Sequence, residues 1–376
     1  MAITIPPEIC GIICKEPVLA RHDLHKLCSV TQSFRGEAER LLYTAVTLRG
    51  LRRIKAFCIT VARRPYLALY LRKLALYMPP QMDLEADDLS RIMRALHLSV
   101  NLKELSVLQD TSRGMPDKPG TAVQRWILDG HDFRLEKFTN SYFQPPVLTN
   151  FLAHQPSIET LTVKCKGNAE ICGAALPNLA NLDSSAAVVQ EFSMPSWYKR
   201  NIQRLQFQFE QSTDVEELAT FVALTQFKDS LKSLSIRRNG SENGLDIAVL
   251  TACVAAQLPD IKYLRIMDHS MRLETYHVPF LPFPIRFTQI ETLIFRAPTR
   301  AFDDTKEDAK ISSYIELRSA EGRRGAAERI MEILPTLTRL VFVGIHVHEF
   351  RRNPQSDSIS EQDLNVLDDD DWMNVP

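Results

Sequence analysis

The chain of 376 residues is long enough for two or three ordinary domains, or for one repeat array with a small added module. Apolar residues make up 45% and charged residues 24%, and the net charge is −1, so gross charge indicates neither a nucleic-acid nor a membrane partner. No apolar run reaches the roughly 18 residues of a membrane span, and the N-terminus lacks the basic start of a signal peptide. Seven cysteines without paired spacing indicate reduced thiols, so we expect a cytoplasmic or nuclear protein.

Residues 3–48 carry the pattern of three short amphipathic helices. Pro7 suits the first position of a helix, and Asp23 can cap the second one. A third amphipathic run contains Phe34, Ala38 and Leu41. A core built from about 45 residues is marginal by itself, so this group needs a partner or a neighbouring domain.

The order of residues in this group resembles an F-box. The resemblance rests on Ile5-Pro6-Pro7-Glu8-Ile9, Ile12-Ile13, Asp23-Leu24, Leu27, Val30 and Ser33-Phe34-Arg35. The run that follows is similar to the first strand after the F-box in fungal F-box proteins with degenerate leucine-rich repeats, through Leu42-Tyr43, Val46 and Leu48.

This resemblance implies a substrate-recognition subunit of an SCF-type cullin-RING ubiquitin ligase. The F-box would dock on the adaptor subunit that joins it to the cullin, and the repeats would bind a protein substrate. Candidates for the adaptor-binding face, or for the core behind it, are Pro6, Pro7, Ile9, Ile12, Ile13, Leu24, Leu27, Val30 and Phe34. The alternative is a leucine-rich-repeat scaffold whose N-terminal helices are only a cap, without a ubiquitin role.

Residues 49–70 are strongly basic, and their apolar residues recur at helical spacing. We expect an amphipathic helical linker or cap with a solvated charged face.

From residue 71, a hexad of the form apolar-x-x-apolar-x-apolar recurs, as in a repeat array. Its copies start at Leu71, Leu102, Leu135, Ile158, Leu179, Ile202, Leu231, Ile261, Ile290 and Leu337. The last four residues alternate as in a strand, so the first, fourth and sixth residues are expected in the core. With helical patterns between the copies, the sequence predicts an α/β fold. The predicted fold is an irregular leucine-rich-repeat solenoid, or horseshoe, over 71–352, with an insertion around 297–333 and the small all-helical F-box-like module over 1–48. An ordinary α/β sheet with chance matches to the hexad is the alternative.

The third and fifth residues of each hexad, and the one after it, are expected on the concave face. Candidates for substrate binding there are Lys164, Arg204, Arg237, Tyr263, Arg265, Arg296 and Arg339. Arginine suits bidentate contacts with carboxylates and phosphates, so we expect an acidic or phosphorylated protein segment as the ligand. An evenly solvated edge, or neutralisation by the chain's own acidic tail, is the alternative.

The tail over 353–376 has seven acidic residues and neither Lys nor Arg, which predicts disorder. Trp372 and Met373 leave open a short linear motif or a self-inhibitory strap. The sequence has no G-x-x-x-x-G-K-[ST], G-x-G-x-x-G or G-x-S-x-G pattern, and His346 with His348 is interpreted as an exposed pair and not as a metal site. We therefore expect a protein that is not an enzyme and uses neither a metal nor another cofactor.

Overall fold

A computed structural model describes part of the chain. The chain is divided into two compact units. The described residues are 5–79, 85–110, 125–143, 145–164, 176–193, 201–239, 244–245, 247–269, 287–296, 319–344, 346–353, 355–356 and 358–375. The first unit spans 1–165 with 174–178, and the second spans 166–173 with 179–376. This division falls within the predicted repeat region and not at residue 48.

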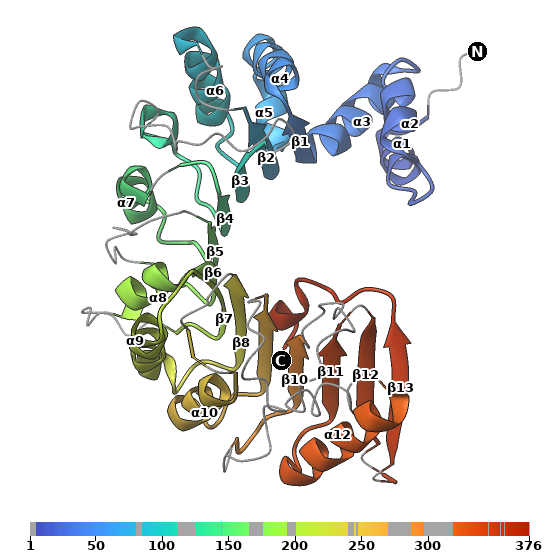
Figure 1. Cartoon of the computed structure of the whole chain (residues 1–376). Helices are drawn as coiled ribbons and strands as arrows, with labels where there is room; N and C mark the ends of the chain where they lie inside the picture. The colour runs from blue at the N-terminus through green and yellow to red at the C-terminus, as the bar shows by residue number, and fades with distance from the viewer. Residues whose placement is uncertain are drawn as a thin grey trace, which may run out of the picture. The chain divides into compact units, whose positions relative to one another are not determined.

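The first unit begins with three helices, α1 (Pro7–Cys14), α2 (Arg21–Leu27) and α3 (Gln32–Thr44) (Figure 1). Pro7 occupies the first turn of α1, as its fixed φ and missing N–H favour. The Thr31 hydroxyl caps α3 by accepting the N–H of Phe34 at 3.3 Å. Asp23 is not the cap of α2, because it lies one turn inside the helix and accepts the N–H of Ala20 at 3.1 Å.

Strands and helices then alternate through the rest of the first unit. The elements are β1 (Ala45–Arg49), α4 (Leu51–Arg63), α5 (Tyr66–Tyr70), β2 (Lys73–Met78), α6 (Ala86–Leu98), β3 (Glu104–Gln109), η3 (Arg125–Leu128), β4 (Lys137–Asn140), α7 (Pro145–Ala153) and β5 (Thr160–Val163). Each strand pairs in parallel with the next. The basic segment 49–70 forms helices as expected, and α4 buries Ile54, Phe57 and Val61.

The second unit continues the alternation and ends in antiparallel strands. Its elements are β6 (Asn181–Ser185), α8 (Ala186–Ser193), β7 (Arg204–Glu210), α9 (Asp214–Leu224), η4 (Thr225–Phe227), β8 (Ser233–Asn239), α10 (Ile247–Gln257), β9 (Tyr263–Asp268), β10 (Thr292–Arg296), α12 (Ala320–Ile333), β11 (Arg339–Val343), β12 (Val347–Arg352), β13 (Ile359–Leu364) and η6 (Asp371–Met373). Strands β6 to β11 are parallel, whereas β11, β12 and β13 pair antiparallel. Helices α8, α9 and α10 lie along one side of β6 to β8 (Figure 1).

The hexads predict the parallel strands and the core accurately. Every strand from β2 to β11 begins at the third residue of a hexad. The first, fourth and sixth residues of every copy are buried, as in Leu231, Leu234 and Ile236. The period of two along a strand explains this, since the fourth and sixth side chains point to the same face.

The predicted fold class, however, is wrong. The chain is a mixed α/β protein whose described residues form a sheet of 13 mostly parallel strands in sequence order, and not a helical module followed by a leucine-rich-repeat horseshoe. The hexad copies from residue 71 onward mark β2 to β11, and the run with Tyr43, Val46 and Leu48 has the same form at β1, whereas β12 and β13 carry none. Strand β1 follows α3 directly, and connections of three and six residues bring β12 and β13 back antiparallel, because a parallel return needs a longer crossover.

Two further expectations concern the C-terminal part of the chain. The prediction of a disordered tail over 353–376 is wrong, because residues 359–364 form β13 and residues 371–373 form η6. Of the insertion predicted around 297–333, α12 is described, whereas residues 297–318 lie outside the described residues.

Candidate protein-binding surfaces

The three N-terminal helices form a small core on one side of α1. Cys10 and Cys14 lie one turn apart and pack with Phe34 and Ala38 of α3. Burial raises the pKa of the Cys14 thiol above its ordinary value. Both thiols are therefore packing groups here, as expected for buried cysteine.

The other side of α1 presents apolar side chains to solvent. Ile9, Ile12 and Ile13 follow the helical period and are 45%, 59% and 36% exposed. Val18 and Val30, in the connections that flank α2, are 90% and 59% exposed. So many exposed apolar side chains on a folded group of about 40 residues are typical of a surface that binds another protein.

The structure separates two roles that the sequence could not distinguish. Among the predicted adaptor-binding residues, Phe34 belongs to the core, and Leu24 and Leu27 are partly buried against it. The exposed members are Pro6, Pro7, Ile9, Ile12, Ile13 and Val30. We call these six the N-terminal apolar surface.

In the second unit, alternate residues of β7 to β11 share one face of the sheet, which we call the arginine face. In one row of neighbours the register aligns Arg204, Ser233, Tyr263, Thr292 and Arg339. The next row is Gln206, Ser235, Arg265, Ile294 and Val341. The intervening residues point to the opposite face, where Phe209 contacts Phe221 of α9.

Residues 367–375, the C-terminal segment, lie on the arginine face and form hydrogen bonds with it through their backbone. Arg204 donates from Nε and Nη2 to the carbonyl of Val375, at 3.1 and 2.6 Å. Ser233 donates to the carbonyl of Trp372 at 2.7 Å. Arg265 donates from Nη1 to the carbonyls of Asp368 and Asp369, both at 3.2 Å.

Side chains of the C-terminal segment add two acidic contacts and an apolar anchor. Asp369 pairs with Arg237 at 3.2 Å and with Arg265 at 3.1 Å. Asp371 pairs with Arg339 at 2.5 Å. The anchor is Trp372, which is 1% exposed in a cluster with Tyr263, Ile294, Val341 and Val375.

The packing of the C-terminal segment on the arginine face goes with shifted pKa values of the ionisable side chains near Asp371. Burial raises the pKa of the Tyr263 hydroxyl, and the negative charge of Asp371 adds to that effect. Burial opposes the charge of Arg339, but its hydrogen bonds to Glu349 and Asp371 raise its pKa. For Glu349, burial favours the neutral form, but hydrogen bonds from Arg351 and Arg339 lower its pKa. The ionised forms are thus favoured in this network of arginines and carboxylates.

The predicted substrate-binding residues have different environments in the structure. Arg204, Arg237, Tyr263, Arg265 and Arg339 lie under the C-terminal segment, and Tyr263 and Arg265 are each only 2% exposed. Arg296 lies on the same face of β10 and contacts the ring of His269. Lys164 belongs to the first unit, where it directly follows β5 and is exposed.

The hexad pattern predicts Ser233 on the ligand face, since it is the third residue of the copy that starts at Leu231. Sequence reasoning missed Trp372 and Val375 as core residues. A tryptophan next to four consecutive aspartates did give a signal, because a large aromatic side chain rarely serves a fully solvated tail.

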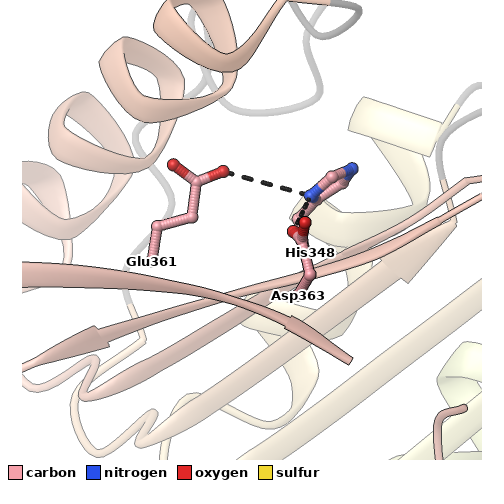
Figure 2. A group of neighbouring side chains, drawn as sticks. All are labelled: His348, Glu361 and Asp363. Atoms are coloured by element: carbon pink, nitrogen blue, oxygen red, sulfur yellow. Dashed lines mark hydrogen bonds and ion pairs between the residues drawn. The ribbon is translucent and has the colours of Figure 1, made fainter. Parts of the chain in front are cut away.

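A second polar group joins β12 and β13. His348 Nδ1 lies 2.6 Å from a carboxylate oxygen of Asp363 and 3.9 Å from one of Glu361 (Figure 2). The three side chains share the sheet face that α12 approaches, and could supply three metal-ligand atoms within 4.8 Å of one another. Arg323 of α12 already lies 3.9 Å from Glu361, so a cation there would meet a competing positive charge. We assign this group to the attachment of β12, β13 and α12.

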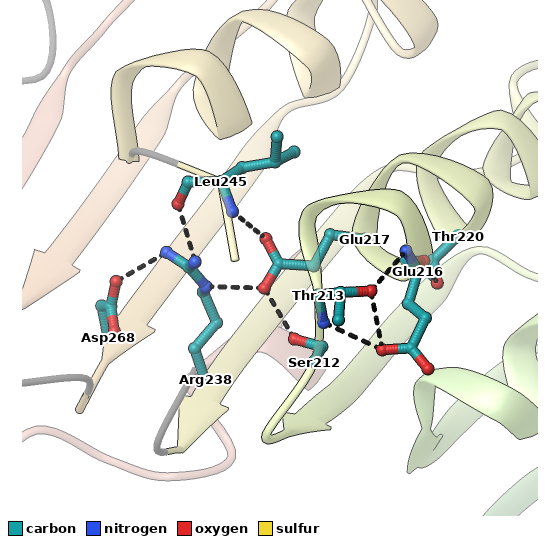
Figure 3. A network of polar contacts seen from close by, with 8 residues as sticks. All are labelled: Ser212, Thr213, Glu216, Glu217, Thr220, Arg238, Leu245 and Asp268. Atoms are coloured by element: carbon teal, nitrogen blue, oxygen red, sulfur yellow. Dashed lines mark hydrogen bonds and ion pairs between the residues drawn. The ribbon is translucent and has the colours of Figure 1, made fainter. Parts of the chain in front are cut away.

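A third polar group is fully enclosed between β8, β9 and α9. Arg238 pairs with Glu217 at 3.1 Å and with Asp268 at 2.7 Å, and its side chain is 2% exposed (Figure 3). Glu217 also accepts from the Ser212 hydroxyl and from the N–H of Leu245. The charged groups of this network are satisfied by one another and by neighbouring residues of the same chain. We therefore assign the network a structural role and not a ligand-binding one.

A shallow pocket between α4 and α6 offers a thiol among arginines. Its lining is Cys58, Ile59, Ala62, Arg63, Arg91 and Arg94. Burial raises the pKa of Cys58 to about 12, so the thiolate that a nucleophile requires is scarce at neutral pH.

Comparison with known proteins identifies no family for the chain: no family model matches it, and no curated protein matches it. None of the described helices is long and apolar enough to cross a membrane.

Proposed function

We propose that the chain is the substrate-recognition subunit of an SCF-type cullin-RING ubiquitin ligase, and not an enzyme. The N-terminal apolar surface docks on the adaptor subunit, which carries the cullin. The arginine face holds a protein substrate. The chain itself makes and breaks no bonds and needs no cofactor, because its contribution is to hold the substrate near the ubiquitin-charged enzyme.

The observation that carries this proposal is the exposure of Ile9, Ile12 and Ile13 on α1 and of Val30 just before α3, beside a core that Phe34 already fills. Each buried aliphatic side chain contributes about 1.5–3 kcal/mol when it leaves water. A partner that covers this surface therefore gains affinity without any rearrangement of the core. The resemblance of the same residues to an F-box names the adaptor subunit as that partner.

An N-terminal cap without a ubiquitin role is the alternative, and it also has an observation in its favour. Helix α3 runs directly into β1, the first strand of the sheet, so the three helices precede the edge at which a cap is needed. A cap alone gives no reason for outward isoleucines on α1, which is why we favour the docking role.

Capture of the adaptor subunit by purified full-length protein tests the proposal. We expect binding by wild type and a loss of at least tenfold in affinity for Ile12→Asp, since a charge would enter a desolvated interface. The matched control is Val222→Asp, which places the same charge at a residue of α9 that is 62% exposed. The proposal is wrong if wild type fails to bind the adaptor subunit, or if both variants bind equally well.

A further inference from the structure

The C-terminal segment shows what chemistry the arginine face accepts. Three arginine or serine side chains bind its backbone carbonyls, which any extended peptide also carries. These contacts hold a chain in place but do not select its sequence. Selection rests on the two acidic contacts and on the Trp372 anchor.

The acidic contacts follow a period of two. Asp369 reaches Arg237 and Arg265, and Asp371 reaches Arg339. Asp368 and Asp370 form no ion pair within the described residues, and both are exposed. The pattern that the face reads is thus an acid, any residue, a second acid and then an aromatic residue.

The aromatic residue of the pattern occupies a site that is lined by apolar and aromatic side chains of the sheet. Trp372 packs among Tyr263, Ile294 and Val341, on three adjacent strands. The Trp372 side chain buries more apolar surface area than the side chain of any other residue in the segment can. An acidic peptide without an aromatic residue would leave this site open to water.

The position of the C-terminal segment also allows another peptide to replace it on the arginine face. It is tethered to the end of β13 by residues 365–366, and Val366 is 80% exposed. The side chain of Asp369 remains 77% exposed although it pairs with two arginines. Arg204 binds the segment only through a carbonyl and has no carboxylate partner in the described part of the chain, so positive charge remains for an anionic ligand.

We infer that the arginine face is a binding site for acidic-x-acidic-aromatic peptide segments, and that the chain's own C-terminal segment occupies this site in cis. The inference rests on the proposed function, because it names the substrate class of the same face. A partner with this pattern competes with a tethered segment, whose effective concentration is in the millimolar range for short linkers. Release of the segment therefore precedes or accompanies substrate capture.

A labelled peptide with the sequence of residues 366–375 tests this inference on the full-length chain. We expect the variant Trp372→Ser, which loses its own anchor, to bind the peptide at least tenfold more tightly than wild type. Adding Arg265→Gln to that variant should abolish binding, whereas adding Lys262→Gln should not, because Lys262 pairs with Glu291 and does not contact the segment. A peptide with serine in place of its tryptophan should not bind.

Hydrogen exchange on wild-type protein provides a second measurement that does not depend on the folding of any variant. Excess peptide should raise the exchange rate of residues 367–375, since it displaces them. Equal peptide affinity of wild type and Trp372→Ser, or binding that is insensitive to Arg265→Gln, would overturn the inference. Neither readout involves the adaptor subunit, so failure of adaptor binding and failure of this inference are separate results.

Discussion

At the scale of single residues, Arg238 shows how the second unit tolerates a buried charge. Its guanidinium is shared between Glu217 on α9 and Asp268 on β9, and it also donates to the carbonyl of Leu245 at 2.7 Å. A buried charge that loses such partners costs several kcal/mol. Gly244 lies beside this network with so little space that a Cβ atom would overlap both Glu217 and Arg238.

We therefore expect Gly244→Ala to lower the free energy of unfolding by about 2–4 kcal/mol, because the added methyl group separates the ion pairs. Urea denaturation of the full-length protein measures this change. The matched control is Gly325→Ala within α12, where the new Cβ meets only Arg329 at 3.7 Å. The control should raise stability by about 0.5–1 kcal/mol through helix propensity, and a loss in both variants would contradict the steric explanation.

At the scale of elements, each hexad determines where a parallel strand begins and which of its side chains are buried. The copy over 261–266 places Ile261, Leu264 and Ile266 in the core, each at most 1% exposed. Between them, Tyr263 and Arg265 face the C-terminal segment. A single six-residue pattern thus specifies the core on one side of the strand and the binding chemistry on the other.

This division of labour predicts unequal costs within one copy. Leu264→Ala should reduce the free energy of unfolding by about 2–5 kcal/mol, since it leaves a cavity beneath β9. Lys262→Ala should cost at most about 1 kcal/mol, because it removes an ion pair with Glu291 that is partly exposed to solvent. Thermal or urea unfolding measures both, and equal losses would show that the hexad does not define the core.

The hexads also explain how far the sequence predicts the fold and the site. Strands β2 to β11 and their core residues follow from local alternation, which a sequence displays directly. The pairing of β12 and β13 depends on contacts between segments without a repeated pattern, so the sequence predicts a horseshoe and not the observed sheet. The sequence predicts a disordered tail because the arginines that neutralise its charge, Arg237, Arg265 and Arg339, lie 32 or more residues away in sequence.

At the scale of the whole molecule, long-range contacts close the second unit. Arg204 on β7 and Val375 are 171 residues apart, yet they share two hydrogen bonds. Between them, Arg339 joins β12 to η6 through Glu349 and Asp371, both at 2.5 Å. The attachment of the C-terminal segment is thus coupled to the ionisation of a buried carboxylate on a neighbouring strand.

Glu349 should make this closure sensitive to acid. It is 2% exposed, and its pKa is lowered from 4.5 by the hydrogen bonds of Arg351 and Arg339, which outweigh its burial. Because the pKa in the folded state lies below that of the unfolded state, its contribution to stability is present above the unfolded value and is lost as pH falls through the lowered value. Urea unfolding of wild type between pH 6 and pH 3 should show a larger loss of stability than unfolding of Glu349→Gln, in which the amide cannot titrate. Glu321→Gln, on the exposed first turn of α12, is the control and should follow wild type. If Glu349→Gln loses as much stability in acid as wild type, the coupling of the C-terminal segment to this carboxylate does not exist.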